Sequence, residues 1–436
     1  MTHLKNLVLV FLLGIGCWAS AQDTGNVQTY KKRVLETTEV DFLSSYYAQT
    51  GDNAAVSGGI GTEELTDATG TFVVSIPLND DDVLTIDAGV SAYTSASSSN
   101  IDPFDGVRRA DPFVASSGAS SGDVWVNLTG SYSHSSDDRN NIVSGKLSVS
   151  SEYDYFSIGF GGSYSRLFNE KNTELSLNAT VYLDSWNTIY PFELRPFGNN
   201  GIGFFRPTEI TGNVNYSPNF TEFEKTNRNS YTFGLGFSQI LHKNLQGSLA
   251  LDLVQQQGLL STPFQRVYFS DVADSFIEGF QLADDVERLP DSRFKIAMGG
   301  RLNWFLNQSI TVRTFYRYYL DDWGINSHTA SVEVPVKISD TFTLYPSYRY
   351  YQQTAADYFG GYETHLSTQE FYTSDFDLSQ YVANQFGFGV SYTDIFTQLH
   401  IWEFGFKGFD LKFYKYDRDT TFGSYIVTGG FTFVMD

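Results

Sequence analysis

A two-residue alternation of apolar and polar side chains between Arg293 and Tyr351 constrains the fold more than any other feature of this sequence. A period of two is typical of a β-strand with two unlike faces. The alternation recurs in four successive segments, namely 293–306, 309–321, 326–337 and 341–353. Strands of about ten residues, apolar on one face and polar on the other, are what a tilted membrane-spanning strand requires. The stretch therefore predicts an all-β chain that forms a transmembrane antiparallel β-barrel.

The same pattern elsewhere in the chain predicts about sixteen strands in total. The other strands are expected at 34–47, 71–78, 83–93, 122–134, 141–152, 155–168, 173–185, 229–241, 245–256, 384–396, 401–417 and 422–435. Numbered along the chain, the even connections are all short. The long connections are all odd, namely Ala48–Gly70, Thr94–Ser121, Ser185–Arg228, Gln257–Ser292 and Thr354–Ala383. Short periplasmic turns at one rim and long extracellular loops at the other are typical of outer-membrane barrels.

The N-terminus has the features of a secretory signal peptide. Lys5 precedes an apolar segment that ends near Gly16, and an A-x-A cleavage site follows at 19–21. We therefore expect three parts, a signal peptide at 1–21, a periplasmic N-terminal lead-in at 22–33 and an outer-membrane β-barrel domain at 34–436. This organisation predicts export to the outer membrane of a Gram-negative bacterium.

Cysteine usage and charge restrict the classes of function. Cys17 is the only cysteine, and a lipoprotein anchor at Cys17 remains an alternative to simple cleavage. The mature chain would then hold no disulfide, which suits a barrel closed by its own hydrogen bonds. The formal net charge of −22 argues against nucleic acid as a partner. The aromatic content of 16% fits aromatic girdles at two membrane interfaces.

Four segments of the mature chain carry a family resemblance. They are VLETTEVDFLSSYYAQTGDNAAVSGGIGTEELTD, PLNDDDVLTIDAGVSAYTSASSSNIDPFDG, SGASSGDVWVNLTGSYSHSSDDRN and SSEYDYFSIGFGGSYS. Together they resemble an uncharacterised exported family common in Bacteroidota, the domain-of-unknown-function family 3570. The resemblance implies an outer-membrane barrel. Because genes of the family often lie near a flavin-transferase gene, it also implies a link to redox or metal handling. It supplies no catalytic motif.

In the predicted register, charged side chains gather on the inner face of the barrel in two sets. The basic set comes from four consecutive strands and comprises Arg293, Lys295, Arg301, Arg313, Arg317, Lys337 and Arg349. The acidic set comes from strands near the start and middle and comprises Glu39, Asp41, Asp87, Glu174, Asp184 and Asp252. Opposed charged walls create a field across a pore, which orients polar solutes and biases ion passage. The equally open alternative is that these charges pair across a filled lumen.

Three loops offer further candidate sites. Asp102, Asp105 and Asp111 supply oxygen ligands for a divalent cation such as calcium, although their spacing matches no defined calcium loop and Asp-Pro pairs are ordinary turn formers. The acidic loop Asp271–Asp291 is expected to be a solvated face, with cation bridging to lipopolysaccharide as the alternative. The loop Ser185–Arg228, rich in Pro, Phe, Gly and Asn, is too apolar to lie free in water. We expect it to fold into the barrel mouth or to bind a partner.

These features favour a non-enzymatic function without a resident cofactor. The histidines are scattered, and no Gly-rich phosphate loop follows a strand. The preferred function is a porin-like channel or transporter for a small polar solute or ion. The alternative is a non-conducting binding or assembly protein whose long loops engage a partner. Expected partners are outer-membrane lipid, lipopolysaccharide and, because Thr428–Met435 resembles a C-terminal insertion signal, the barrel-assembly machinery during insertion.

Overall fold

The computed structural model describes residues 32–94, 123–199, 210–277 and 279–435. The chain divides into two compact units, Met1–Arg33 and Val34–Asp436, and every described strand belongs to the second. The expected signal peptide and nearly all of the expected lead-in lie outside the described residues.

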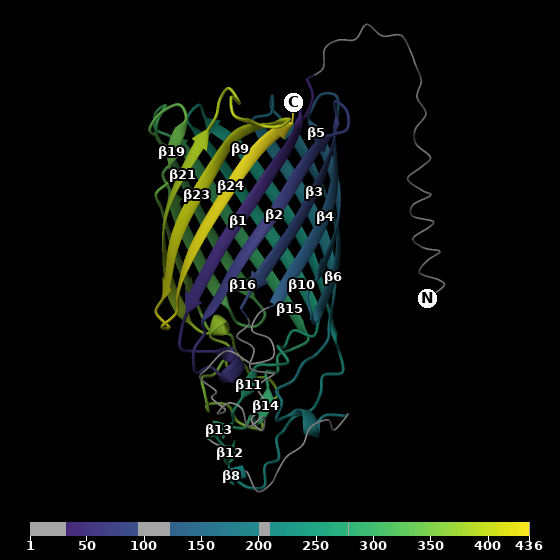
Figure 1. Cartoon of the computed structure of the whole chain (residues 1–436), viewed down its shortest axis with the longest axis vertical. Helices are drawn as coiled ribbons and strands as arrows, with labels where there is room; N and C mark the ends of the chain where they lie inside the picture. The colour runs from purple at the N-terminus through teal and green to yellow at the C-terminus, as the bar shows by residue number, and fades with distance from the viewer. Residues whose placement is uncertain (1–31, 95–122, 200–209, 278, 436) are drawn as a thin grey trace, which may run out of the picture. The chain divides into compact units, whose positions relative to one another are not determined.

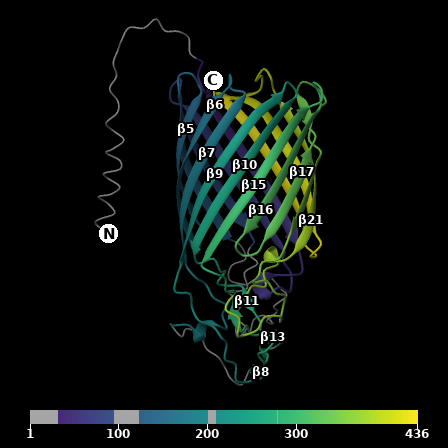
Figure 2. The ribbon, with the colours of Figure 1, turned by 180° about the vertical axis from the view of Figure 1, so that it is seen from behind.

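Within the described ranges, sixteen barrel strands form one closed antiparallel ring (Figures 1 and 2). Two of these strands are each made of two pieces. β1 closes the ring by pairing with β24, from Thr38 opposite Met435 to Thr50 opposite Gly423. The predicted fold class is therefore confirmed. The strands are β1 (Thr38–Thr50), β2 (Leu65–Pro77), β3 (Asp82–Tyr93), β4 (Asp123–Ser135), β5 (Asn141–Ser151), β6 (Tyr155–Phe168), β7 (Thr173–Trp186), β9 (Asn227–His242), β10 (Leu245–Gly258), β15 (Ser292–Phe305), β16 (Thr311–Asp321), β17 (Asn326–Glu333) with β18 (Val336–Lys337), β19 (Phe342–Leu344) with β20 (Ser347–Gln353), β21 (Tyr381–Thr393), β23 (Phe404–Arg418) and β24 (Gly423–Met435).

Proline explains why two predicted strands are interrupted. Pro335 separates β17 from β18, and Pro346 separates β19 from β20. Proline has no N–H to donate to the ladder, so a strand loses its regular pairing there. The carbonyls of both prolines still accept, from the N–H of Thr311 and of Val334 respectively.

Several other strand limits also differ from the prediction. β2 begins at Leu65 rather than 71, because 65–70 pairs with the end of β1 although its Thr, Asp and Gly are typical of turns. β1 extends to Thr50 rather than 47, because its last residues pair with β2 on one side and with β24 on the other. The last short connection is longer than expected and contains the two-residue strand β22 (His400–Ile401), which pairs back onto β23.

The outer face of the barrel is apolar, which is the reverse of a water-soluble protein. Leu147 and Leu249, near the middle of their strands, are 68% and 65% exposed. Aromatic side chains on the same face lie near both rims, with Phe156, Phe294 and Tyr425 toward one end and Phe168, Trp304 and Phe342 toward the other. A smooth apolar belt between two aromatic girdles is the surface that a lipid bilayer requires. No described helix is long and apolar enough to cross a membrane.

The long loops fold into a second structure at one rim, which we call the cap. Its described residues are 51–64, 187–199, 210–226, 259–277, 279–291 and 354–380. It lies beyond the strand ends, at the rim opposite the end of β24 (Figures 1 and 2). Its elements are β8 (Ile210–Gly212), β11 (Arg266–Val267), β12 (Ser275–Ile277), β13 (Phe280–Gln281), β14 (Asp285–Val286) and the 3-10 helices η2 (Ala55–Ser57), η3 (Arg195–Phe197) and η5 (Phe376–Leu378). β11 pairs with β14, and β12 lies between β8 and β13.

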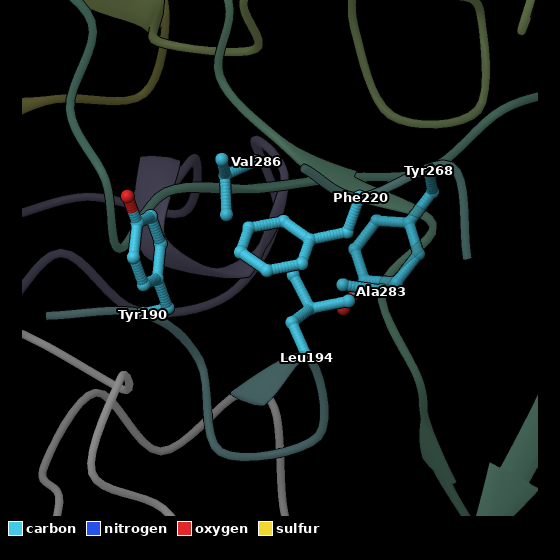
Figure 3. Packing of buried hydrophobic residues seen from close by; sticks show 6 residues of the cluster. All are labelled: Tyr190, Leu194, Phe220, Tyr268, Ala283 and Val286. Atoms are coloured by element: carbon cyan, nitrogen blue, oxygen red, sulfur yellow. The ribbon is translucent and has the colours of Figure 1, made fainter. Parts of the chain in front are cut away.

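The cap has the conventional hydrophobic core that the barrel wall lacks. Side chains from two separate loops pack together in its largest described cluster (Figure 3), which comprises Tyr190, Leu194, Phe220, Tyr268, Ala283 and Val286. Two smaller clusters surround Phe280 and Phe269. Burial of these large apolar side chains stabilises each one by about 1.5–3 kcal/mol relative to exposure. The cap is therefore a folded unit rather than a set of free loops.

Candidate functional site

The strand register assigns the predicted basic residues to the inner, polar face of the barrel. The alternate positions Phe294, Met298 and Leu302 are exposed on the outer face, so the intervening residues of β15 point inward. β16, β18 and β20 follow in register with β15 around the ring. The inward basic residues are Arg293, Lys295 and Arg301 on β15, Arg313 and Arg317 on β16, Lys337 on β18 and Arg349 on β20.

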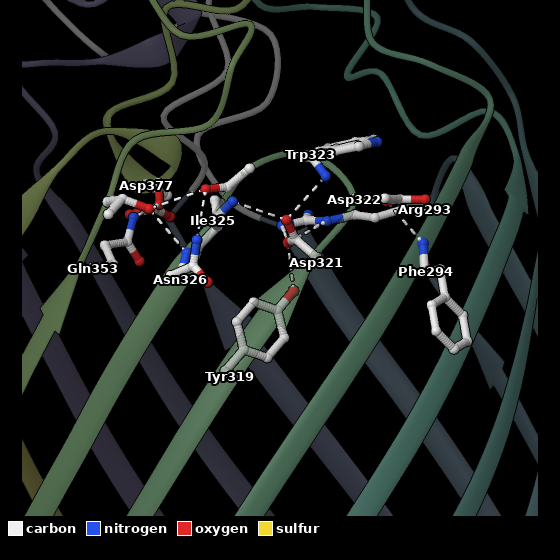
Figure 4. A network of polar contacts seen from close by, with 12 residues as sticks. Arg293, Phe294, Tyr319, Asp321, Asp322, Trp323, Ile325, Asn326, Gln353 and Asp377 are labelled. Atoms are coloured by element: carbon white, nitrogen blue, oxygen red, sulfur yellow. Dashed lines mark hydrogen bonds and ion pairs between the residues drawn. The ribbon is translucent and has the colours of Figure 1, made fainter.

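Arg293 is neutralised where the wall meets the cap (Figure 4). Its Nε and Nη2 lie 3.0 and 2.5 Å from Oδ2 of Asp321, and its guanidinium lies 4.2 Å above the ring of Trp323. Asp321 also accepts hydrogen bonds from the Tyr319 hydroxyl at 2.6 Å and from the Trp323 and Ile325 backbones at 3.0 Å each. This network fixes the turn between β16 and β17, so Arg293 has a structural role here.

Other inward bases differ in how they are paired. Arg313 donates to Glu333 on the neighbouring strand at 2.9 Å. Arg301 lies 5.2 Å from the ring of Phe315. No hydrogen bond or ion pair joins Arg301, Arg317 or Arg349 to another described residue, and all three are exposed to the lumen. These arginines therefore carry charge that no described protein group neutralises.

The predicted acidic residues also lie on the inner face, in three different settings. Glu39 accepts from Lys407 at 2.7 Å, and Asp41 accepts from the Thr432 hydroxyl at 2.6 Å. Asp87 lies 3.4 Å from an Asn127 amide nitrogen. Asp184 is buried and accepts from Ser157 at 2.7 Å and Arg228 at 3.4 Å. Glu174 and Asp252 have no hydrogen bond or ion pair among the described residues.

The expectation of two fully opposed walls is wrong for Glu174 and Asp252. β10, which carries Asp252, pairs directly with β15. β7, which carries Glu174, lies two strands beyond β10 and therefore three from β15. Both acids line the same inner-wall pocket as Arg301 and Arg317. Only the acids of β1 and β3 lie across the ring of described strands from β10 and β16.

We call this inner-wall pocket the lumen recess. Its volume is about 400 Å³. Glycine, alanine and serine form its floor, namely Ser176, Gly236, Ser238, Ser248, Ala250, Ala297 and Gly299. Small residues leave the space open, while Glu174, Asp252, Arg301 and Arg317 stand around it. The recess is thus a hollow bordered by charges of both signs.

A buried cluster centred on Arg266 joins three loops of the cap. Nε and Nη2 of Arg266 donate to the two oxygens of Glu193 at 2.6 and 3.0 Å, and Nη1 donates to the carbonyl of Val56 at 3.2 Å. The side chains of Arg266 and Glu193 are 1% and 0% exposed. The three residues belong to the loops that follow β10, β7 and β1. Because β1 and β10 stand on opposite sides of the ring, the bond from Arg266 to Val56 joins loops from opposite sides of the mouth, whereas the ion pair joins loops of strands that are two apart.

The acidic loop Asp271–Asp291 is only partly the solvated face that its charge pattern predicts, because Asp271, Asp274 and Asp291 are exposed but its central acids are not. Asp285 and Glu287 are buried. Asp285 forms an ion pair with Arg288 at 2.9 Å and accepts from the Tyr372 hydroxyl at 2.6 Å. Glu287 accepts from the Thr262 backbone at 2.7 Å and from the Thr373 hydroxyl. The loop is buried because β14 pairs with β11 inside the cap, and the apolar residues flanking its acids were the sequence signal for this.

Burial changes the titration of the cap carboxyls. Burial, followed by the charge of Asp375, raises the pKa of Glu287 to about 8. Burial also raises the pKa of Asp284 to about 6 and that of Glu63 to about 7. The cap therefore holds carboxyl groups that exchange protons near neutral pH.

The remaining loop candidates divide between the cap and the residues that the structure does not describe. Within 185–228, Tyr190 and Phe220 pack into the hydrophobic core of the cap (Figure 3). Asp102, Asp105 and Asp111 lie outside the described residues. In the described ranges, no group of three or more His, Cys, Asp and Glu side chains converges to hold a metal ion.

Comparison with known proteins places the chain in a family. The model of the family described as "Protein of unknown function (DUF3570)" matches residues 10–430. The chain belongs to this family. No curated protein matches the sequence.

Several solved structures of outer-membrane proteins are similar to this family member. A bacterial polysaccharide outer membrane secretin matches with a TM-score of 0.45 and 11% identity, over 92% of this chain and 99% of that chain. A ferric enterobactin receptor from Pseudomonas aeruginosa gives 0.42 and 11% over 89% of this chain, which spans 54% of the receptor. The TodX monoaromatic hydrocarbon channel gives 0.37 and 9%, over 92% and 91% of the two chains.

In this family member, the wall and the cap present different polar groups. The inner face of the wall carries exposed guanidinium groups and carboxylates. The cap is held together in part by buried polar contacts. The two parts meet where Arg418 of β23 donates to Asp377 of the cap at 2.6 Å and Gln353 of β20 donates to the Asp377 and Ser379 carbonyls at 2.9 and 2.6 Å.

Proposed function

We propose that the protein is an outer-membrane channel for small polar solutes that carry an acidic group, with its extracellular mouth covered by the cap. The observation that carries this proposal is that Arg301, Arg317 and Arg349 are exposed and form no hydrogen bond or ion pair with any other residue in the described ranges. A charge held in a filled, dry lumen needs a partner, because an unpaired buried charge costs several kcal/mol. Charges that stay exposed in the lumen are in contact with water and available to a solute.

The proposed location rests on the outer surface of the barrel. The apolar belt and its aromatic girdles suit the lipid of an outer membrane, with lipopolysaccharide in the leaflet nearest the cap. Export by a signal peptide and insertion by the barrel-assembly machinery belong to the same proposal. The short turns would then face the periplasm, as in other barrels of this type.

The unpaired arginines give the channel a preference for anions. A confined lumen screens charge less than an open surface, so a solute close to the wall experiences a positive field. The net charge of −22 does not oppose this, because it sums acids over the whole chain, including the cap. At the lumen recess, Glu174 and Asp252 oppose the charge of Arg301 and Arg317, so the positive field there is weaker than at Arg349.

The cap limits access from outside. Its tie through Arg266 spans the mouth, so a solute must pass around the cap or wait until it loosens. Arg266→Met leaves Glu193 buried without its partner and is expected to loosen the tie. The conductance of this variant should exceed that of the native protein.

The test is current through single molecules in planar bilayers under a salt gradient. The native protein and Arg266→Met should both favour anions, and Arg301→Gln with Arg317→Gln should reduce that preference in each background. Lys146→Gln, which removes an inner-face charge from β5, is the matched control. Cation preference in the native protein, or unchanged preference in the arginine variants, contradicts the proposal. Absence of current in every variant favours the alternative, a non-conducting protein whose loops engage a partner.

A further inference from the structure

We infer that the lumen recess is a binding site for a small zwitterion, namely a short peptide with a free carboxylate and a free ammonium group. This inference rests on the proposed function, since it names the class of solute that the channel takes. The recess combines three features that are independent of one another, which are its hollow floor, its unpaired charges of both signs and the separation between those charges.

The strand register sets the positions of the charges. Glu174 lies opposite Ser238, Ser238 opposite Ser248, and Ser248 opposite Arg301, so one row of paired residues runs from the acid to the base. Adjacent strands are about 4.8 Å apart, so three steps separate the two Cα atoms by roughly 14 Å. Both side chains extend into the lumen, which lets their charged ends approach more closely than their backbones.

The next row keeps the space between these charges open. Gly236, Ala250 and Gly299 lie opposite one another across β9, β10 and β15, and Arg317 continues the row on β16. Asp252 stands two residues beyond Ala250 on β10. The floor residues are too small to bridge the acids and the bases, and no ion pair joins the two sides.

A dipolar ligand completes this arrangement. Its carboxylate would meet the guanidinium groups of Arg301 and Arg317, which suit planar two-oxygen anions, while its ammonium would meet Glu174 and Asp252. An extended tripeptide spans about 10 Å between its ends, which is shorter than the roughly 14 Å between the Cα atoms of Glu174 and Arg301 and leaves room for their side chains. Phe315, beside Arg301, offers an apolar surface to the peptide side chains. Because the charges are already placed on rigid strands, binding requires little reorganisation.

The probe is trialanine, compared with N-acetyl-trialanine, which lacks the ammonium, and trialanine amide, which lacks the carboxylate. Binding is measured by titration calorimetry on the full-length protein in detergent, where both rims are open to solvent. We expect trialanine to bind at least about tenfold more tightly than either capped peptide, since each lost charge pair is worth about 1.4 kcal/mol or more.

The variants assign each end of the peptide. Arg301→Gln with Arg317→Gln should abolish the difference between trialanine and its amide and keep the difference between trialanine and its N-acetyl form. Glu174→Gln with Asp252→Asn should do the reverse. Ala250→Trp should abolish binding by filling the recess, because Ala250 is exposed to the lumen and nothing in the fold depends on its size. Lys146→Gln should bind like the native protein. Heat-dependent migration on gels confirms that each variant is folded.

Equal affinity for all three peptides, or differences that persist in the paired variants, would overturn the inference. So would the absence of trialanine binding at millimolar concentration. The result also separates the two proposals. Binding with the expected pattern but no current in any variant rejects the channel and keeps the site, whereas current without binding keeps the channel and rejects the site.

Discussion

The barrel wall and the cap are built from one chain but follow opposite rules. The wall is apolar outside and polar inside, and its strands are joined by backbone hydrogen bonds between neighbours. The cap is apolar inside, and side-chain contacts join loops far apart in the sequence. The two regions therefore bury different kinds of side chain. The wall turns its apolar side chains toward lipid, whereas the cap hides them from water.

Charges show the contrast most clearly. In the wall, ion pairs such as Arg313 with Glu333 remain partly exposed to the lumen. In the cap, Arg266 and Glu193 are buried, and Arg266 donates to both Glu193 oxygens and to the Val56 carbonyl. A solvated pair contributes little to stability, whereas breaking a buried pair leaves a charge with no solvent.

The largest effect is expected from Arg266→Met in the cap. Glu193 would remain buried without its partner, which costs about 3–5 kcal/mol. Hydrogen exchange should show that cap amides near β11 lose protection, while the barrel strands keep theirs. The matched control is Lys225→Met, which removes an exposed cap ion pair with Asp291 and should leave exchange unchanged.

The size of the loss of amide protection shows whether the contacts of Arg266 stabilise the cap. If Arg266→Met leaves cap protection intact, the cap does not depend on the Arg266–Glu193 pair. Equal loss of protection in the strands would mean that wall and cap unfold together, and the two regions would then not be separate units.

The second effect concerns the outer face of the wall. Leu147→Arg places a charge near the middle of the lipid-facing belt and should cost about 2–4 kcal/mol. Ser148→Arg, one position along on the inner face, should cost much less because the lumen is polar. Urea unfolding in lipid vesicles, followed by heat-dependent gel migration, measures both. Equal costs would contradict the assignment of the two faces.

The third effect is a pH dependence confined to the cap. The pKa of Glu287 rises from its ordinary 4.5 to about 8, so the folded cap binds this proton more tightly than the unfolded chain. The resulting stability is fully present below about pH 4.5 and is lost as the pH rises through about 8. Cap protection from proteolysis should therefore fall between pH 5 and pH 8. Glu287→Gln should flatten this fall, and a profile identical to that of the native protein would exclude Glu287 as its source.

The smallest effect is expected from Arg313→Gln in the wall. Its partner Glu333 is partly exposed to the lumen, so removing the pair should cost only about 0.2–1 kcal/mol. The same urea unfolding assay measures the change. A loss as large as that from Arg266→Met would show that the lumen is dry near β16 and β17 and would weaken the contrast between the regions.

Most of the wall could be predicted from sequence, because its structure depends on neighbours. Alternation within 293–353 identifies strands, faces and inward charges together, and Pro335 and Pro346 mark the interruptions. The predicted strand order already places 245–256 beside 293–306, so the mixed charge of the lumen recess was implicit in the sequence, and the expectation of opposed walls overlooked it.

The cap could not be predicted in the same way. Arg266 contacts Glu193 and Val56, which are 73 and 210 residues away along the chain. No periodicity relates such positions. The acids near Asp285 resemble a solvated run in the sequence, and only the pairing of β11 with β14 shows why they are buried. Local patterns describe a barrel well, whereas a domain made from loops depends on contacts that the barrel itself brings together.

The tie through Arg266 has a mechanical consequence for the barrel. A ring of hydrogen-bonded strands resists changes in circumference but flattens into an ellipse at little cost, because flattening leaves every strand pair intact. The hydrogen bond from Arg266 to Val56 joins the loops after β1 and β10 and so links opposite sides of the ring at one end. The rim beside the cap should therefore keep a round cross-section under lateral membrane pressure, while the rim with short turns deforms more readily.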